Sequence, residues 1–420
     1  MPLVSWYFGT FSPNLLLNLV WLPVLGLAVM PLGLLGTILA VFGWTAPAGG
    51  LLLGLAARIA DGLLWLLDAV QGSGLTPVLA VLRPLWPEIL GFALLLVTAA
   101  ICLRARRRVP ELLAGIGFVL LVAPHVLVMA VDSRDRVSLA MLDVGLGQSL
   151  VISLPGGHRW LVDTGGGSVT FDLGEAVVGP SLALGRPPRL DGIFLSHPDV
   201  DHSHGLPYLI EHFKVGALYT NGMLPRGLTG KRLDRVLPES GVKPAELVAG
   251  DVVTLSSGVR VAVLHPGAGF AGERANERSL VLRLERNGRS LALLPGDIET
   301  GGIRDMLDNG ADVSAEVLVL PHHGSRGSFD AGFYAKVRPE AVLCSNGFMN
   351  RYGFPAAAVV GAATAAAGGR LYTTSRNGRV VCAWDGPGGP LSVQFTTAPC
   401  HDCSSDIEVH IETESGPETE

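Results

Sequence analysis

The segment LSHPDVDHSHG, residues 195–205, places three histidines and two aspartates within eleven positions. It directly follows the apolar run LDGIF, which is typical of a buried strand. Burying carboxylates and imidazoles costs several kcal/mol per group unless a partner compensates for the lost hydration, and a cation is the usual partner. The segment therefore predicts a metal site at the end of a strand.

His197, Asp199, Asp201 and His202 form the pattern H-x-D-x-D-H. The four side chains follow one another too closely for one tetrahedral ion to take all of them, because such an ion has only four positions at fixed angles. Two neighbouring ions can share them. The spacing therefore favours a site with two ions.

Further candidate ligands also close apolar runs. LLPGD brings Asp297 to a strand end, LVLPHHGS does the same for His322 and His323, and WLVDTGGG places Asp163 before a glycine turn. Two ions about 3.5–4 Å apart, with a water as nucleophile, are a standard arrangement for in-line attack on phosphodiesters. A single aspartate after a strand is more often a turn residue, but several such motifs rarely coincide by chance.

Short β-rich runs separated by Gly and Pro fill the second part of the chain, with helical patterns at 204–213 and 355–367. This alternation predicts an α/β fold in which two sheets are sandwiched between helix layers, with ligands at the strand ends. The runs are VSLAMLDVG, SLVISLP, RWLVDTGG, GIFLSHP, RVAVLHP, SLVLRLE, SLALLPGD, EVLVLPHHGS and AVLCSNG.

The first part of the chain has the composition of a membrane region. Residues 1–50 contain no charged side chain and residues 1–131 contain only ten, in a chain of 420 residues with a mean hydropathy of +0.42. Three segments, 14–35, 85–103 and 112–131, are long enough to span a bilayer. Pro23 and Pro31 predict a kinked or broken first helix.

Residues 51–70, LLLGLAARIADGLLWLLDAV, carry Arg58, Asp61 and Asp68 on one helical stripe. We expect an amphipathic helix lying on the outer membrane surface; the alternative is a helix packed inside the membrane bundle. The arginines of RARRR, residues 104–108, mark a cytoplasmic loop. The third span then leads outward, which predicts a multi-pass protein of the inner (plasma) membrane with a cytoplasmic N-terminus and a periplasmic or extracellular catalytic domain.

Four regions result from these patterns. They are a membrane region at 1–131, a linker at 132–138, a hydrolase domain at 139–398 and an acidic, disordered tail at 399–420. No cleavable signal peptide is visible, and the uncharged N-terminus predicts that upstream sequence has been lost. The net charge of −6 gives no electrostatic argument for nucleic-acid binding. The five cysteines are too scattered for a disulfide framework, and Cys400 and Cys403 are interpreted as an incidental pair.

The motifs resemble those of the metallo-β-lactamase superfamily, whose signature is H-x-H-x-D-H. More narrowly, their order resembles that of the extracellular domain of ComEC-type competence proteins, which are DNA-uptake channels; that family has Asp in place of the second His, as Asp199 is here. FGTFSPNLLLNLVWLPVLGLAVMPLGLL is similar to the end of the family's competence region. The motifs in question are LDVG, VDTGGG, LSHPDVDHSHGL, NERSLVLRL, LLPGDIE, LVLPHHGS, SNGFMNRYGFP and TTSRNG.

The resemblance implies a metallo-β-lactamase-like αββα sandwich and a set of ligands for two divalent ions, Zn or Mn. His197 and Asp199 would hold one ion, and Asp201, His202 and His323 the other, with Asp297 as the bridge. His323 is preferred to His322 because superfamily relatives place the ligand just before a small residue and Ser. The candidate catalytic groups are Asp201, Asp297 and His322, the last for proton transfer or phosphate binding.

The sequence departs from the family pattern at three places. The superfamily's third-motif His is missing, and NERS, Asn276 to Ser279, stands there; relatives of the ComEC type share this feature. Phe354 in YGFP replaces the His of the usual YGHP, and DVGLGQS differs from DVGQGDA. Ser325, Arg326, Asn350 and Arg351, with Arg376, are candidates for substrate binding because they lie in or beside the late motifs.

These observations predict a membrane-anchored phosphodiesterase that degrades one strand of incoming DNA during natural transformation. Its partners would be single-stranded DNA, the lipid bilayer and the remaining channel components. Two alternatives stay open. One is a metal-dependent hydrolase of a non-nucleic ester, because the fold does not fix the substrate. The other is a truncated, inactive channel component whose metal site is structural.

Overall fold

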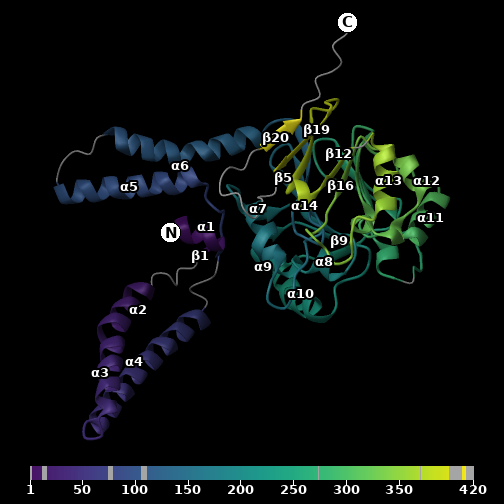
Figure 1. Ribbon diagram of the computed structural model, residues 1–420. Coiled ribbons are helices and arrows are strands. Elements are labelled where there is room, and N and C mark those ends of the chain that lie inside the picture. The colour runs from purple at the N-terminus through teal and green to yellow at the C-terminus, as the bar shows by residue number, and fades with distance from the viewer. Residues whose placement is uncertain are drawn as a thin grey trace. The chain divides into compact units, whose positions relative to one another are not determined.

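The computed structural model describes residues 2–11, 17–73, 79–105, 111–272, 274–368, 370–396 and 409–412. The chain forms two compact units, Met1–Arg83 and Pro84–Glu420 (Figure 1). Each unit is described by itself below.

The first unit is a helical hairpin with a small two-stranded sheet at its base. The proline-containing segment is interrupted as predicted: a π-helical stretch, η2, lies between Pro23 and Pro31. A Cβ atom on Gly49 would lie 2.7 Å from the carbonyl oxygen of Gly36, so α3 and α4 can approach this closely only with glycine there. The elements are α1 (Pro2–Phe8), β1 (Thr10–Phe11), α2 (Asn18–Val24), η2 (Leu25–Val29), α3 (Met30–Val41), α4 (Ala46–Gly72) and β2 (Leu79–Ala80).

The second unit begins with two apolar helices, α5 (Trp86–Ala105) and α6 (Glu111–Asp132). They pack through glycine, because a Cβ atom on Gly91 would lie 2.7 Å from the carbonyl oxygen of Gly117. A polar contact also joins them, because His125 Nε2 lies 3.0 Å from Glu88 Oε1 on the neighbouring helix.

Four helices in the described residues are long and apolar enough to cross a membrane: 18–41, 46–70, 86–104 and 111–132. Three of them coincide with the predicted spans. The fourth is the predicted surface helix, and its length and composition also suit a span. The protein is therefore membrane-associated, whereas three or four spans, and the orientation, stay predictions. Arg106, Arg107 and Arg108 of the predicted cytoplasmic loop lie outside the described residues.

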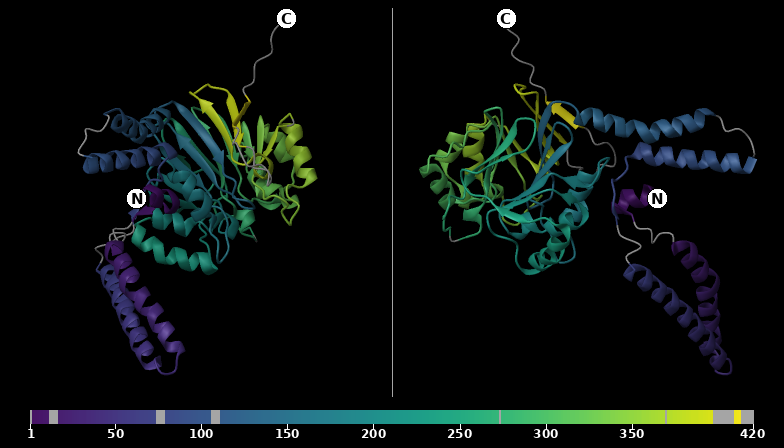
Figure 2. Two further views of the ribbon diagram at one scale, coloured as in Figure 1. Left: turned by 60° about the vertical axis from the view of Figure 1, so that its left-hand side comes forward. Right: turned by 180° about the vertical axis from the view of Figure 1, so that it is seen from behind.

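The rest of the second unit contains two sheets packed face to face (Figure 2). The first has the order β10-β9-β7-β5-β4-β3-β18-β19-β20 and the second β11-β12-β13-β14-β15-β16-β17; β6 (Arg189–Leu190) and β8 (Lys214–Val215) pair separately. The strands of the first sheet are β3 (Arg136–Met141), β4 (Leu150–Leu154), β5 (His158–Val162), β7 (Gly192–Leu195), β9 (Leu218–Thr220), β10 (Pro244–Glu246), β18 (Val380–Asp385), β19 (Leu391–Thr396) and β20 (Val409–Glu412). Those of the second are β11 (Val252–Thr254), β12 (Val259–His265), β13 (Val281–Arg286), β14 (Arg289–Leu294), β15 (Val317–Val319), β16 (Ala341–Cys344) and β17 (Leu371–Thr373).

Helices cover the outer face of each sheet, so the domain has the predicted αββα layers. Neighbouring strand residues point to opposite faces: Trp160 packs between the sheets, whereas Leu161 packs under the helices. This explains why the strands read as continuous apolar runs. The helices are η3 (Gly174–Val178), α7 (Gly179–Ala183), α8 (Val200–Ser203), α9 (Leu206–His212), α10 (Gly227–Ser240), η4 (Asn276–Arg278), α11 (Thr300–Asp308), η5 (Pro321–Gly324), η6 (Arg326–Ser328), α12 (Ala331–Val337), α13 (Ala357–Ala366) and α14 (Thr374–Asn377).

Two predicted boundaries differ from the structure. The linker at 132–138 is shorter than predicted, because α6 runs to Asp132 and β3 begins at Arg136. In the tail at 399–420, Val409–Glu412 form β20, which pairs antiparallel with β19, so these four residues are not disordered. The other tail residues lie outside the described part of the chain, as do Cys400 and Cys403.

The loop between α5 and α6 gives a test of topology. We expect a reporter that is active only outside the cytoplasm to work after Ala398 and to fail after Arg107, because clustered arginine stays inside. The same reporter at the N-terminus fails if three helices span and works if all four span. Activity after Arg107 together with none after Ala398 would invert the predicted orientation.

Candidate metal centre

Parallel strands carry the predicted ligands to one edge of the sandwich. Asp163 follows β5 and His197 follows β7, its parallel neighbour. In the other sheet, Asp297 follows β14 and His323 follows β15, which are also parallel neighbours. The carboxyl ends of parallel strands lie at the same edge, so residues more than a hundred positions apart meet there.

Four of these side chains form a compact group. Asp201, His202, Asp297 and His323 each offer one nitrogen or oxygen atom, and these atoms all lie within 4.8 Å of one another. His202 Nε2 lies 3.3 Å from His323 Nε2 and 3.1 Å from Asp297 Oδ1, and His323 Nε2 lies 3.5 Å from Asp201 Oδ2. Imidazole nitrogen and carboxylate oxygen without thiolate suit zinc or manganese.

The two histidines present the same ring nitrogen to the group. Nδ1 of His202 donates to Asp163 Oδ2 at 2.7 Å, and Nδ1 of His323 donates to the carbonyl oxygen of Ser345 at 2.9 Å. Each ring therefore keeps Nε2 for the centre of the group, which is how metal-binding histidines are usually oriented. His202 and His323 are both buried. The residues present thus fit a divalent ion.

Asp163 holds His202 in place and is itself fully buried. Its carboxylate accepts hydrogen bonds from Ser196 N and Ser196 Oγ at 2.8 Å, from Gln148 Nε2 at 2.9 Å, and from His202 Nδ1. With its oxygens occupied in this way, Asp163 is a positioning residue rather than a metal ligand. Its φ of 60° is in the left-handed region, which costs an ordinary residue free energy and is typical of functional sites.

The carboxylates of the four-residue group are stabilised in their ionised form by positive charge on the neighbouring histidines. Burial alone would raise the pKa of Asp201, but His202 and the hydrogen bond from His323 outweigh burial and lower it to about 2. Asp297 likewise keeps a pKa well below its usual range, against burial, because of His202 and His323. Burial would lower the pKa of His202, yet Asp297 and Asp163 raise it well above the usual range. Protons on the imidazoles therefore balance the carboxylates, and a divalent ion would replace them as pH rises.

The predicted ligands of the first ion are less complete. His197 Nε2 is buried without a hydrogen-bond partner among the described residues, and it lies 3.8 Å from Asp199 Oδ2. Nδ1 of His197 lies 3.0 Å from Ser196 Oγ, which leaves Nε2 as an unused acceptor. Burial and the neighbouring His202 lower the pKa of His197, so it stays neutral, as a ligand must. The structure thus brings four of the predicted ligands into one group that could hold an ion, with His197 and Asp199 farther apart from each other.

His322 lies beside the group rather than in it. Its Nε2 is 3.7 Å from Asp297 Oδ2 and its Nδ1 is 3.6 Å from Glu299 Oε1, with about a fifth of the side chain exposed. His322 and His323 both have positive φ values, 49° and 53°, which point their rings in different directions. The geometry thus brings His323 into the four-residue group and leaves His322 at its solvent side.

A cleft of about 450 Å³ opens over the group. Phe354 lines it with its ring 5.8 Å from that of His322, and stacks on Tyr352 at 5.4 Å. Arg351 also lines the cleft, and its guanidinium lies 4.7 Å from the centre of the Tyr352 ring. Phe354 thus forms an apolar wall directly beside His322.

The other predicted substrate-binding residues either stabilise nearby loops or lie outside the cleft. Asn350 uses its side chain to bind the backbone N–H and carbonyl of Phe354, at 2.9 and 2.7 Å, which fixes the loop. Ser325 Oγ accepts from Gly327 N as the cap of η6. Arg326 is exposed on η6. Arg376 lines a separate cavity of about 490 Å³, away from the four-residue group.

The segment in place of the third-motif histidine supports Asp297 indirectly. Ser279 Oγ accepts a hydrogen bond from Asp297 N at 3.2 Å, and Asn276 begins the short helix η4. Two further histidines have local partners: His265 Nδ1 donates to the Ser279 carbonyl, and His204 Nδ1 lies 3.1 Å from Thr229 Oγ1.

Three contacts in the site were not predicted from the sequence: those of Ser196, Gln148 and Glu299. Ser196 could have been found, because it directly precedes His197 at the end of the strand. Gln148 lies in DVGLGQS, which was noted only for the residues that it lacks. Glu299 is the last residue of LLPGDIE, a motif in which only Asp297 was taken as a candidate.

Comparison with known proteins agrees with this architecture. Residues 142–309 match the family model of the metallo-beta-lactamase superfamily, and residues 1–107 match that of the competence proteins. Among solved structures, the match with the Igni18 metallo hydrolase of Ignicoccus hospitalis includes 58% of this chain and 98% of the Igni18 chain. The sequence identity is 15% and the TM-score is 0.39. The match with YhfI of Bacillus subtilis includes 56% of this chain and 96% of the YhfI chain, with 13% sequence identity and a TM-score of 0.37.

Two curated relatives are similar at higher sequence identity. ComE operon protein 3 of Bacillus subtilis is 33% identical over 231 residues, which are 51% of this chain and 29% of that protein. Competence protein ComA of Neisseria gonorrhoeae is 29% identical over 355 residues, 82% of this chain and 44% of that protein. The chain thus spans less than half the length of either relative.

The fold and the ligand group define a domain of the metallo-β-lactamase superfamily, a class of metal-dependent hydrolases. A competence-protein region precedes this domain in the same chain. The resemblance to ComEC-type competence proteins, inferred from the motifs, is therefore confirmed.

The contact between Asp163 and His202 leads to a test of metal binding. Asp163→Asn should weaken the binding of zinc or manganese about 10- to 100-fold, because the amide no longer fixes the ring of His202. The measurement is a competitive metal titration of the purified protein. Asp234→Asn, an exposed carboxylate on α10, is the control and should leave the affinity unchanged. Equal affinities of Asp163→Asn and the control would contradict the positioning role.

Proposed function

We propose that this chain is a membrane-anchored, metal-dependent phosphodiesterase that cuts DNA during its uptake, degrading one strand. The observation that carries the proposal is the convergence of Asp201, His202, Asp297 and His323 at one strand edge, under a cleft open to solvent. The competence-protein region in the same chain supports DNA as the substrate.

His202, His323 and Asp201 would hold one divalent ion, His197 and Asp199 would hold a second, and Asp297 would bridge the two. Bound ions would activate water and neutralise the negative charge that develops on a phosphodiester. Two features of the residues themselves support this division. Nε2 of His197 is buried and unpaired, and Asp297 lies within 3.7 Å of His202, His322 and His323.

His322 is the candidate for moving a proton. It is partly exposed to the cleft, and the carboxylate of Glu299 lies 3.6 Å from its Nδ1, while its Nε2 lies 3.7 Å from Asp297. Arg351 lines the same cleft and carries a charge suited to a backbone phosphate. Single-stranded DNA, the lipid bilayer and further channel components are the partners that the proposal implies, with the domain outside the cytoplasm.

Hydrolysis of a non-nucleic ester is the second candidate function. The apolar wall of Phe354 and Tyr352 beside His322 favours it, because an uncharged ester needs such a surface and a phosphate does not. A structural metal in an inactive chain is the third possibility. Activity assays separate all three.

The direct test compares three substrates with the purified full chain: single-stranded DNA, a lactone and a phosphocholine ester. We expect metal-dependent cleavage of DNA only. Asp297→Asn should reduce cleavage to background, because an amide cannot bridge two cations as a carboxylate does. Asp308→Asn on α11 is an exposed control and should retain full activity. Cleavage of only one of the esters, or DNA cleavage that survives chelation, would refute the proposal.

Phe354 offers a second test, because its ring stands where a proton donor or ligand could reach the cleft. Phe354→His should raise the rate of DNA cleavage, by up to about 10²-fold, the lower end of general acid–base contributions. Phe348→His, in the same loop but 75% exposed and outside the cleft, is the control and should have no effect. An unchanged rate and metal affinity in Phe354→His would show that the apolar wall is neutral for this reaction.

A further inference from the structure

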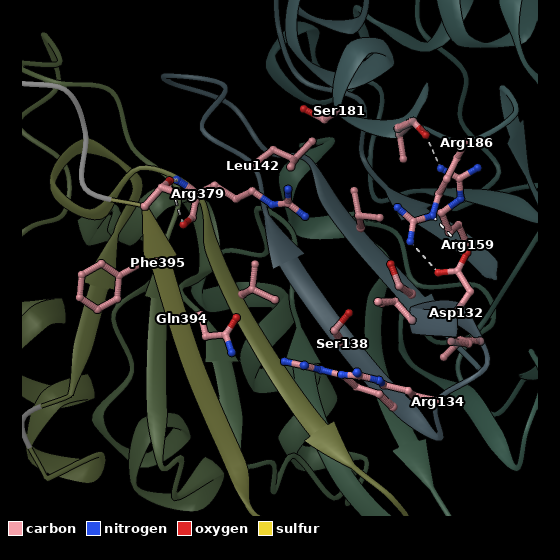
Figure 3. Close-up of a pocket in the computed structure, with 18 residues that line it drawn as sticks. Asp132, Arg134, Ser138, Leu142, Arg159, Ser181, Arg186, Arg379, Gln394 and Phe395 are labelled. Atoms are coloured by element: carbon pink, nitrogen blue, oxygen red, sulfur yellow. Dashed lines mark hydrogen bonds and ion pairs between the residues drawn. The ribbon is translucent and has the colours of Figure 1, made fainter. Parts of the chain in front are cut away.

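A basic pocket lies on the first sheet, at the end of the apolar helix α6. Its volume is about 400 Å³, and its lining comes from the end of α6, from β3, β4, β5, β18 and β19, and from α7. Figure 3 shows Arg159 and Arg186 gathered near Asp132, with Arg379 on the opposite side and Arg134 near Ser138. We call this cavity the arginine pocket. The five arginines that line it are Arg134, Arg136, Arg159, Arg186 and Arg379.

Positive charge in the arginine pocket exceeds negative charge. Among the described residues, Asp132 is the only carboxylate that lines it, and it pairs with Arg186 at 2.6 Å. Arg136 has a partner outside the pocket, Asp385, at 3.7 Å, and that carboxylate is 70% exposed. No side-chain partner is found in the described part of the chain for Arg134 or Arg379. The pocket therefore has room and charge for an anion.

Arg159 is the most unusual member, because its side chain is buried and no carboxylate of the described residues lies within ion-pair distance of its guanidinium. Asp132 and Asp191 favour its charged form only from farther away. The guanidinium donates to three neutral backbone carbonyls, those of Leu182, Pro187 and Arg189. Its Nε has no hydrogen-bond partner. A buried guanidinium that binds only neutral carbonyls directly, with its carboxylates farther away, has an incompletely balanced charge, so this arrangement suits an anion that the protein receives from outside.

The arginines also repel one another. Burial and the neighbouring Arg186 lower the pKa of Arg159 to about 10, and the same two causes lower the pKa of Arg379. A bound phosphate would relieve this repulsion and could take bidentate hydrogen bonds from a guanidinium. The hydroxyl groups of Ser138, Ser153 and Ser181 add hydrogen-bond donors to the same lining.

The place of the pocket in the chain indicates where such a phosphate comes from. Val131 and Asp132, the last residues of the 22-residue helix α6, form part of the lining. If α6 spans the bilayer, its end lies at the level of the lipid headgroups. Apolar side chains, among them Leu142, Leu154 and Val381, line the pocket beside the arginines, as suits a molecule with a charged head and an apolar tail. Single-stranded DNA would require a row of aromatic rings, and Phe395 is the only aromatic residue that the described part of the chain contributes to the lining.

We propose that the arginine pocket binds the phosphate headgroup of an anionic phospholipid from the membrane leaflet in which α6 ends. The bound lipid would fix the domain against the bilayer surface at this point. The proposal rests on α6 spanning the membrane and is independent of the metal centre.

The test measures binding of short-chain phosphatidylglycerol to the full chain in detergent, with phosphatidylcholine of equal chain length as the neutral reference. Phosphatidylglycerol should bind more tightly, and Arg134→Gln with Arg379→Gln should weaken its binding by about tenfold or more. The matched control, Arg226→Gln with Arg235→Gln, removes two exposed charges at α10 and should leave binding unchanged. If the double variant does not fold, Arg134→Gln alone, at an exposed side chain, replaces it and should still weaken binding.

Equal affinity for the two lipids would overturn the proposal, and so would an equal loss of phosphatidylglycerol binding in the control variant. Binding of inorganic phosphate as tight as that of phosphatidylglycerol would also overturn it. The same holds if the pocket variant loses binding of oligothymidylate but keeps its binding of lipid. Asp297→Asn separates this proposal from the hydrolase function. That variant should bind phosphatidylglycerol as the unaltered chain does, even though it cuts no DNA.

Discussion

The hydrogen bond from His202 Nδ1 to Asp163 is the contact on which the candidate site depends. It turns Nε2 of His202 toward Asp297 and His323, and it is possible only because Asp163 is held by Ser196 and Gln148. Buried carboxylates and imidazoles that converge in this way need a cation, or protons in its place. The parallel strands of both sheets then serve one purpose, which is to bring these side chains to a common edge.

The same principle, buried charge that requires a partner, distinguishes the two sites of the molecule. At the strand edge, carboxylates outnumber the fixed positive charges and call for a metal ion. On the face of the first sheet, near the end of α6, buried and exposed arginines outnumber the single carboxylate and call for an anion. The four-residue group would catalyse hydrolysis, and the arginine pocket would hold the domain at the membrane. Their ligands have opposite charge, so neither ligand suits the other site.

The layered fold and the candidate ligands at the strand ends could be predicted from the sequence because both depend on local patterns, whereas the assignment of the ligands to each ion followed only from the resemblance to ComEC-type proteins. Apolar runs end in Asp or His at the strand ends, and H-x-D-x-D-H is contiguous. Asp163 was found as a candidate, but its role was not, because a carboxylate with four hydrogen bonds looks the same in sequence as a ligand. The arginine pocket was not predicted at all. Its arginines are spread over almost 250 positions, and only the register of β3, β4 and β18 brings them together.

The central claim is that His202, His323, Asp201 and Asp297 together hold a divalent ion. X-ray absorption of the purified, metal-loaded chain tests this most directly. The account predicts at least one bound ion per chain whose neighbours are only nitrogen and oxygen, with two imidazoles at about 2.0–2.1 Å if the metal is zinc. The absence of a stoichiometric ion, or an ion with sulfur neighbours at about 2.3 Å, would contradict it.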